Sequence, residues 1–369
     1  MKPRACFFSF LILSAIHFWQ APMIFGQAAD KEEEAEKRGG WIALPVVYYT
    51  PETSLAFGLG AMCYFRLAGQ ELKQRPSNVR TLLVYTQKKQ WMIIFSPEFY
   101  LKNEQYLLQG NFMLSKFKSK FWGVGPDTPA EDEEDYSYRV TDIFVKLQKK
   151  VFSRLNFALQ YEHQNNNITE VEERGLLETG MFLGSEGAKV SGLSLLANWD
   201  SRDNIFSPSR GSFYQWTVTF FRKTFGSDYH FDRLNLDLRT YFCLFSDHVL
   251  AIHGFISSTR GEVPFQILPF LGGPMIMRGF YQGRYRDKNA VVFQMEYRLP
   301  LWRRLRMVGF ASAGDVADKI NRFVLANFKI AFGTGIRFAL KPEEKLNFRF
   351  DIGISRESVG FYFTITEAF

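Results

Sequence analysis

The sequence has 369 residues, of which 46% are hydrophobic, 22% charged and 17% aromatic, including 39 Phe and 16 Tyr. This composition excludes a disordered chain, and so many aromatic residues would need an unusually large soluble core, whereas a membrane β-barrel can place them against lipid. The net charge of +7 comes from basic residues spread along the chain rather than gathered in one patch, which argues against nucleic-acid binding.

The first residues have the pattern of a secretory signal peptide. A basic segment, 1–4, precedes an apolar segment, 5–19, and small residues follow around 26–29. The apolar segment is too short for a transmembrane helix, which needs about 20 apolar residues. We therefore predict a signal peptide over 1–28, a flexible charged spacer over 29–40, and a single domain over 41–369.

The rest of the chain shows the period-two alternation of strands. In 345–355, for example, Leu346, Phe348 and Phe350 alternate with Asn347 and Arg349. No later segment has 18 uninterrupted apolar residues, which argues against helical spans, and only a closed barrel can cross lipid with strands. A soluble sandwich gives the same alternation, but usually with shorter strands. The predicted strands are 42–49, 54–66, 78–88, 91–101, 104–116, 136–149, 153–164, 189–199, 211–224, 228–242, 247–258, 289–299, 304–314, 328–340, 345–355 and 359–369.

These segments predict an all-β fold, a transmembrane antiparallel β-barrel of about 16 strands in the bacterial outer membrane. If the last strand ends in the periplasm, the long connections 117–135, 165–188, 259–288 and 315–327 face outward, as this class of barrel requires. Two periplasmic connections, 67–77 and 200–210, are longer than that rule predicts.

The last predicted strand, 359–369, is amphipathic and ends on phenylalanine. Phe361, Phe363, Ile365 and Phe369 share one face, which only Glu367 interrupts. A final strand of this kind resembles the signal by which barrel proteins are recognised for insertion into the outer membrane.

Three blocks near the C-terminus carry a family resemblance: 271–280, which contains Arg278-Gly279-Phe280, then 296–300, then 310–314. Their order resembles the BamA/TamA superfamily of outer-membrane assembly barrels, also called the bacterial surface antigen family. The segment 200–211 resembles a turn of that family, and 49–60 resembles its first hairpin, so that the resemblance covers 41–369. The residues that match the turn are Asp200, Arg202, Asp203, Pro208 and Gly211.

The resemblance implies that the loop carrying Arg278, Gly279 and Phe280 folds back into the lumen as a latch. Glu296, on the predicted inward face, is then the acid that matches Arg278, because a buried guanidinium needs a carboxylate partner. Ser312 stands where the family usually has Asp, and Asp315 can replace that carboxylate only if its loop bends inward. The alternative is a polar turn with a chance Arg-Gly pair.

The resemblance also implies a weak seam between the first and last strands, proposed in that family as a lateral gate. Pro45 lies in the first predicted strand, where it cannot donate a ladder hydrogen bond, although a bulge explains it equally well. Phe361, Phe363 and Phe369 are the corresponding residues of the last strand. The spacer is too short for the periplasmic POTRA modules of full family members, so we expect a barrel-only member.

Residue patterns for catalysis or for metal and cofactor binding are absent. None of the histidines forms a hydrolase motif with Ser and Asp: His17, His163, His230, His248 and His253. The acidic run 131–135 can attract Ca²⁺ but is typical of a solvated loop tip. Cys63 and Cys243 can pair in an oxidising compartment or serve as small apolar residues. We therefore expect no cofactor and no metal.

The resemblance implies that the barrel helps insert or move proteins or lipids at the outer membrane. Its expected partners are outer-membrane lipid, client outer-membrane proteins and periplasmic or lipoprotein partners, but not nucleic acid. A passive pore or structural barrel is the alternative, and an enzyme barrel is a third reading. An open lumen would favour the pore, whereas a loop-filled lumen with a short seam would favour assembly.

Overall fold

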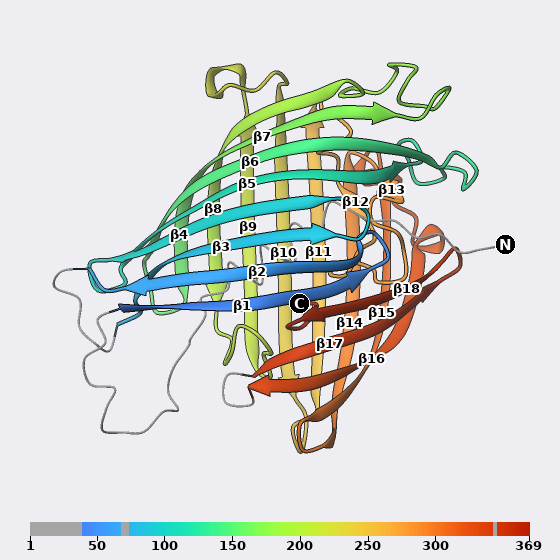
Figure 1. Cartoon of the computed structure of the whole chain (residues 1–369). Helices are drawn as coiled ribbons and strands as arrows, with labels where there is room; N and C mark the ends of the chain where they lie inside the picture. Colours follow the sequence, from blue (N-terminus) through green and yellow to red (C-terminus); the bar gives the residue numbers. More distant parts are fainter. Residues whose placement is uncertain (1–38, 68–73, 342–344) are drawn as a thin grey trace, which may run out of the picture.

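The computed structural model describes residues 39–67, 74–341 and 345–369. Within these residues, sixteen strands form one closed antiparallel barrel, in which β1 lies beside β18 (Figure 1). In the described part of the chain, no helix is long and apolar enough to cross a bilayer. The prediction of a transmembrane barrel of about 16 strands is confirmed; the predicted signal peptide and most of the predicted spacer lie outside the described residues.

Each wall strand contains the centre of one predicted strand. The strands are β1 (Gly39–Thr50), β2 (Ser54–Phe65), β3 (Ser77–Thr86), β4 (Trp91–Leu101), β5 (Tyr106–Phe121), β6 (Glu134–Lys150), β7 (Leu155–Val171), β8 (Gly187–Asp200), β9 (Gly211–Phe221), β10 (Phe231–Cys243), β11 (Val249–Gly261), β14 (Asn289–Trp302), β15 (Leu305–Ala317), β16 (Lys329–Lys341), β17 (Leu346–Ser355) and β18 (Val359–Ile365). Three short 3-10 turns lie in two outer loops: η1 (Lys223–Phe225) between β9 and β10, and η2 (Ile320–Arg322) and η3 (Leu325–Asn327) between β15 and β16.

Several strand ends differ from the prediction, most of all in β7. This strand was predicted to end at 164 but continues through a polar run to Val171, where Asn165 pairs with Thr141 of β6. Backbone pairing continues the ladder there without apolar side chains, because hydrophobic alternation is required only within the lipid band. At the other end of the barrel, β1 begins at Gly39, within the predicted spacer, and pairs with Phe65.

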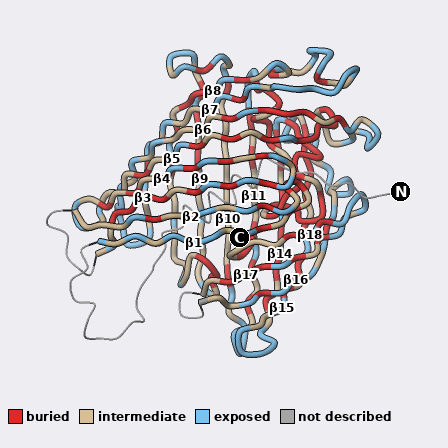
Figure 2. Tube along the Cα trace, viewed as in Figure 1, coloured by how far each residue is buried: buried red, intermediate tan, exposed pale blue. Residues whose placement is uncertain are grey.

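The two faces of the wall have different side chains. In β17, Asn347, Arg349 and Asp351 are buried on the inner face, whereas Phe350 and Ile354 are exposed on the outer face. Buried and more exposed residues alternate along many wall strands (Figure 2). Short turns join the strands at the end that holds residues 102–105 and 303–304, which identifies this end as periplasmic.

The connection between β11 and β14, residues 262–288, folds into the barrel, and we call it the lumen loop. It contains a two-residue ribbon, β12 (Phe270–Leu271) and β13 (Tyr285–Arg286), which the sequence did not predict because two-residue strands have no detectable period. Met277 and Phe280 of the loop pack against the inner wall beside Val292. The loop therefore fills part of the lumen.

The prediction that the last strand runs from 359 to 369 is wrong at its end. β18 ends at Ile365, Thr366 adopts a φ of 71°, and Phe369 is buried inside the barrel. If the strand continued, the alternation would turn Glu367 toward lipid, where a charge is costly. The turn instead places Glu367 against Arg337 of the inner wall, with Arg337 Nε 2.6 Å from Glu367 Oε2.

Candidate functional site

The lumen loop brings one arginine onto the inner wall. Arg278 Nη2 donates to Glu296 Oε2 of β14 at 2.6 Å, and its Nη1 donates to Asp351 Oδ2 of β17. The guanidinium carbon also lies 3.5 Å from the ring centre of Phe310 on β15, as in a cation–π contact. Arg278 is 1% exposed, so it joins the loop to three wall strands in a site closed to water.

Further charged residues extend this contact into a buried network. We call seven residues the lumen cluster: Arg278, Glu296, Arg298, Arg337, Arg349, Asp351 and Glu367. Buried ions destabilise a fold unless partners satisfy them. Glu296 accepts from Arg298 Nε at 2.7 Å besides Arg278, and Asp351 accepts from Arg337 Nη1 at 2.5 Å. Each of these carboxylates therefore binds at least two arginines.

The strand pattern explains why these side chains meet. Glu296 and Arg298 are two residues apart on β14, and Arg349 and Asp351 are two apart on β17, so that each pair faces inward. The register pairs Arg337 of β16 directly with Arg349. Like charges in this position repel each other, and the carboxylates of the lumen cluster offset the repulsion.

Two glycines allow the loop backbone to lie on the wall. Gly279 has a φ of 109°, and a Cβ on Gly353 would lie 2.6 Å from the Arg278 carbonyl carbon. Gly279 N donates to Tyr362 Oη at 3.0 Å, and its carbonyl oxygen accepts from Ser358 Oγ at 2.6 Å. The Arg278-Gly279 segment is therefore tied to β18 and to the β17–β18 loop.

The structure brings Arg278 and Glu296 together, as the resemblance implied, but the second acid is a residue that sequence reasoning did not select. Asp351 takes this place; the alternation of 345–355 puts it on the inner face but does not distinguish it from the other inward polar residues. Asp315 binds Lys329 instead, with Nζ 2.6 Å from Oδ1. Phe280 is buried in the core of the lumen loop, where its ring centre lies 6.1 Å from that of Tyr285.

The family turn motif lies in the β8–β9 turn, residues 201–210. Arg202 pairs with Asp200 at 2.8 Å. Asp203 Oδ2 accepts from Lys345 Nζ at 2.8 Å, which ties this turn to the β16–β17 connection. Gly211 has a φ of 94°, and a Cβ there would lie 2.2 Å from the Ser201 carbonyl oxygen, so the turn requires glycine.

The same turn reaches inward to the last residues of the sequence, 366–369, which we call the tail. Ser207 Oγ donates to Glu367 Oε1 at 3.0 Å, and the carbonyl oxygen of Pro208 accepts from Arg298 Nη1 at 3.1 Å. Arg298 Nη2 also donates to the Phe369 oxygen at 3.0 Å. Turn and tail together thus border the lumen cluster, which accounts for the unexpected length of the turn.

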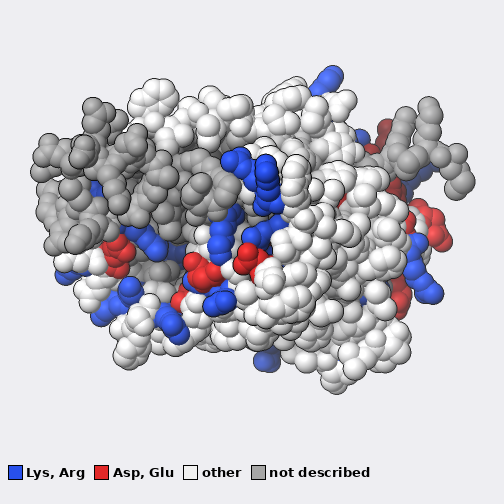
Figure 3. Space-filling model, turned by 90° about the horizontal axis from the view of Figure 1, so that it is seen from below, with Lys and Arg blue, Asp and Glu red and all other residues white. Residues whose placement is uncertain are grey.

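The seam between β1 and β18 is short. β1 pairs with β2 from Gly39 to Thr50, but in the described residues it pairs with β18 at one position, Tyr49 with Phe363. Pro45 lies on the outer face of β1, and Phe361 on that of β18. Seen from below, the molecule has charged side chains gathered in a hollow beside a surface without charged residues (Figure 3).

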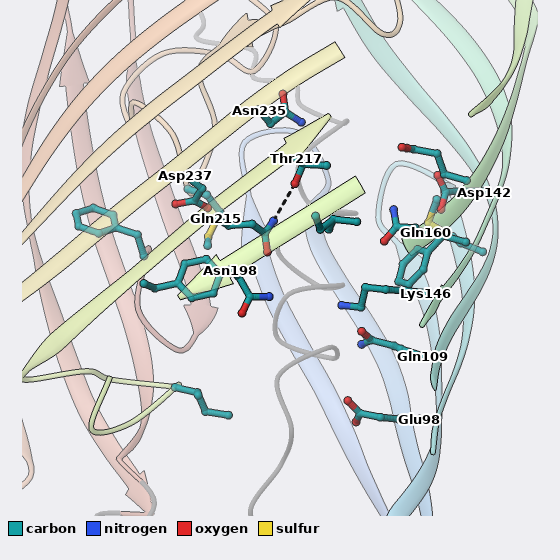
Figure 4. Close-up of a pocket in the computed structure, with 18 of the residues that line it drawn as sticks. Glu98, Gln109, Asp142, Lys146, Gln160, Asn198, Gln215, Thr217, Asn235 and Asp237 are labelled. Carbon is teal, nitrogen blue, oxygen red and sulfur yellow. Dashed lines mark hydrogen bonds between the residues drawn. The ribbon is translucent and has the colours of Figure 1, made fainter. Parts of the chain in front are cut away.

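A polar cavity of about 890 Å³ occupies another part of the lumen. Figure 4 shows Glu98, Gln109 and Lys146 on one side of it, facing Asn198 and Gln215 on the other. Carboxamide and charged groups of this kind suit water or a polar ligand. Arg349, Glu367 and Phe369 also line this cavity, so that it borders the lumen cluster.

Among the described residues, the cysteines and the acidic run do not form a second site. Cys63 and Cys243 are free thiols rather than a disulfide. In the acidic run, Glu133 pairs with Lys120, and Asp135 with Lys118 at 2.9 Å. Among the residues that the structure describes, no group of three or more His, Cys, Asp or Glu side chains is arranged to hold a metal ion.

Comparisons with known proteins agree with this architecture. Residues 85–369 match the Omp85 superfamily domain, whereas a search of curated proteins finds no match. BamA from Haemophilus ducreyi lacking POTRA domains 1-3 is similar in structure, with a TM-score of 0.63 at 16% identity over 90% of this chain and 70% of that one. CdiB from Acinetobacter baumannii has a TM-score of 0.57 at 12% identity, and CdiB from Escherichia coli has a TM-score of 0.58 at 11% identity.

The match to the Acinetobacter baumannii CdiB covers 90% of this chain and 60% of that one. The match to the Escherichia coli CdiB covers 89% of this chain and 62% of that one. At these identities the structural likeness establishes the fold, a BamA-like barrel. The domain match covers most of the chain and agrees with the resemblance found in the motifs. The chain therefore belongs to the Omp85 superfamily and is a β-barrel of the bacterial outer membrane.

Proposed function

We propose that this protein is an assembly or translocation barrel, which helps insert or move proteins or lipids at the outer membrane through the seam between β1 and β18. The observation that carries this proposal is that, in the part of the chain that the structure describes, one pair, Tyr49 with Phe363, joins β1 to β18. Because a hydrogen bond contributes only about 1 kcal/mol net, so short a ladder opens at little cost.

The lumen cluster supports a barrel in which β1 can move while the strands from β14 to β18 stay fixed. The cluster ties the lumen loop to β14 and β17 through Arg278. The next residue of the loop, Gly279, is hydrogen-bonded to Tyr362 of β18. In our proposal, the Arg278-Gly279-Phe280 latch with Glu296 holds the strands from β14 to β18 rigid, while β1 moves away from β18. The β8–β9 turn motif and the tail brace the same wall from the periplasmic end.

A passive pore needs a continuous path for water, and the residues in the outer part of the lumen argue against such a path. Val263, Phe265 and Leu268 of the lumen loop form an apolar cluster with inward residues of the wall, such as Phe121 and Tyr136. This plug favours the assembly reading over the pore.

A disulfide across the seam tests the gate. In a background with Cys63→Ala and Cys243→Ala, the pair Tyr49→Cys and Phe363→Cys places two thiols on directly paired residues. We expect the oxidised protein in liposomes to lose its ability to accelerate folding of a urea-unfolded eight-stranded outer-membrane barrel, and reduction to restore it. Heat-modifiable gel mobility of the eight-stranded probe measures its folding.

The control is Ile352→Cys with Phe361→Cys, which crosslinks β17 to β18 where they are already paired. Its oxidation leaves the probe's folding rate unchanged if only the seam must open. Equal rates for the oxidised and reduced seam pair would refute the gate.

A further inference from the structure

The first strand is apolar on both faces. Trp41, Pro45 and Val47 point outward, whereas Leu44 and Val46 lie on the inner face, four and two residues before the inward Tyr48. The inner face of a water-filled barrel is normally polar. Leu44 is nevertheless 51% exposed, so the inner face of β1 offers apolar surface toward the lumen.

The polar cavity extends to the seam. Its lining includes Tyr48 of the inner face together with Val47 and Ile365, which belong to the outer, lipid-facing set of β1 and β18. Within the described residues β1 and β18 are paired at one position, so the cavity reaches the place where the wall is interrupted. The interruption lies on the periplasmic side of the Tyr49–Phe363 pair, because β18 ends at Ile365 while β1 continues toward Gly39.

Three inward residues stand side by side at this interruption. Arg349 of β17 is the direct partner of Thr364 of β18, and Tyr48 follows Thr364 across the seam in the register set by Tyr49 and Phe363. Tyr48 is 6% and Arg349 1% exposed. Within the described residues, Tyr48 Oη, Thr364 Oγ1 and Arg349 Nη1 are buried and have no hydrogen-bond partner.

Arg349 is also the least satisfied arginine of the lumen cluster. Its Nη2 donates to the Pro274 carbonyl oxygen at 3.1 Å, but its Nε lies 3.5 Å from Asp351 Oδ2. Asp351 is already bonded by Arg278 and Arg337. The buried guanidinium and the two hydroxyl groups have donors that need hydrogen-bond acceptors. An anionic phosphate has enough acceptor oxygens to bind all three groups.

We propose that this row binds the phosphate of an anionic phospholipid from the periplasmic leaflet. The headgroup enters through the interruption and accepts hydrogen bonds from Arg349, Tyr48 and Thr364, while the acyl chains lie against the two apolar faces of β1. A client strand would instead pair with the backbone of β1 and would leave these donors unused. This lipid site is independent of the proposed assembly function and does not require that the barrel insert client proteins.

Native mass spectrometry of the full chain in detergent tests the site. The lipid probe is dioleoyl-phosphatidylglycerol, and dioleoylglycerol has the same acyl chains without phosphate. We expect wild type to retain one phosphatidylglycerol, and Arg349→Gln to weaken its binding about tenfold, as the loss of a charge-assisted hydrogen bond does. Tyr48→Phe and Thr364→Val, which leave the charge unchanged, should each weaken it about threefold to fivefold.

The matched control is Arg304→Gln, which removes an exposed arginine from the β14–β15 turn at the same end and should bind as wild type does. Equal binding by wild type, Tyr48→Phe and Thr364→Val overturns the proposal even if Arg349→Gln does not fold. Equal retention of dioleoylglycerol would reduce the site to an apolar groove. Inorganic phosphate, or a peptide with a free C-terminal carboxylate, binding as tightly as the lipid would identify a free-anion site or a client-terminus site instead.

Discussion

At the scale of single residues, Arg278 connects parts of the chain that are far apart in sequence. Its partners Glu296 and Asp351 are separated from it by 18 and 73 positions. Glu296 faces inward by alternation, and the resemblance selected it. Asp351 has the same alternation, but nothing local distinguishes it from other inward polar residues, because its role depends on which strand closes beside the lumen loop.

Arg278→Ala should destabilise the barrel by about 3–5 kcal/mol, because the change leaves two buried carboxylates short of a partner. The measurement is the urea midpoint of unfolding in lipid, followed by heat-modifiable gel mobility. Arg322→Ala serves as the control, since Arg322 forms an exposed ion pair with Asp318 and should contribute less than about 1 kcal/mol. Similar midpoints for the two variants would mean that Arg278 does not hold the loop.

At the scale of elements, the β8–β9 turn and the tail act together. Their contact joins Ser207 to Glu367 across 160 positions. The sequence showed that the turn is long but not where it goes. It also placed Phe369 on a lipid-facing strand, because period-two alternation cannot reveal a turn after Ile365; the cost of facing Glu367 to lipid explains why the strand ends there.

The contact between this turn and the β16–β17 connection should depend on pH. Partial burial by itself would raise the pKa of Asp203, but hydrogen bonds from Lys345, Ser209 and the backbone of Arg210 outweigh it and hold the pKa below the ordinary value of 3.8. A lowered pKa stabilises the folded state above the unfolded value, and the stabilisation is lost as the pH falls toward the folded value.

Wild type should therefore unfold at a higher temperature than Asp203→Asn at pH 7, and the difference should narrow below about pH 4. Heat-modifiable mobility between pH 7 and pH 2.5 measures both proteins. A difference that stays constant over this range would exclude the carboxylate as its origin.

At the scale of the whole molecule, the lumen has two parts. An apolar cluster around Phe265 lies in the outer part, and a polar cavity of about 890 Å³ lies in the rest. The lumen loop joins these parts, since it contributes Phe265 to the cluster and Met275 to the lining of the cavity. In our proposal this cluster closes the outer end, so that the barrel separates the outside from the periplasm even when the seam is open.

Wild type in planar bilayers should accordingly show little steady conductance, and Phe265→Ala with Leu268→Ala should raise it severalfold by thinning the plug. Phe293→Ala removes a lipid-facing ring, 54% exposed, and should leave the conductance at the wild-type level. Steady, porin-like conductance of wild type would support the passive pore.

The sequence by itself determined the strands, their number and their faces, because alternation is a local property that each segment carries alone. The sequence did not predict strand pairing outside the lipid band, such as that of β7 beyond Gln164, because the apolar alternation ends there. Only the tertiary structure decided that Asp351 is the second acid, that the tail turns inward and that the seam closes at Tyr49 and Phe363. These features depend on contacts across the closed barrel between residues far apart in sequence, and no local pattern records them.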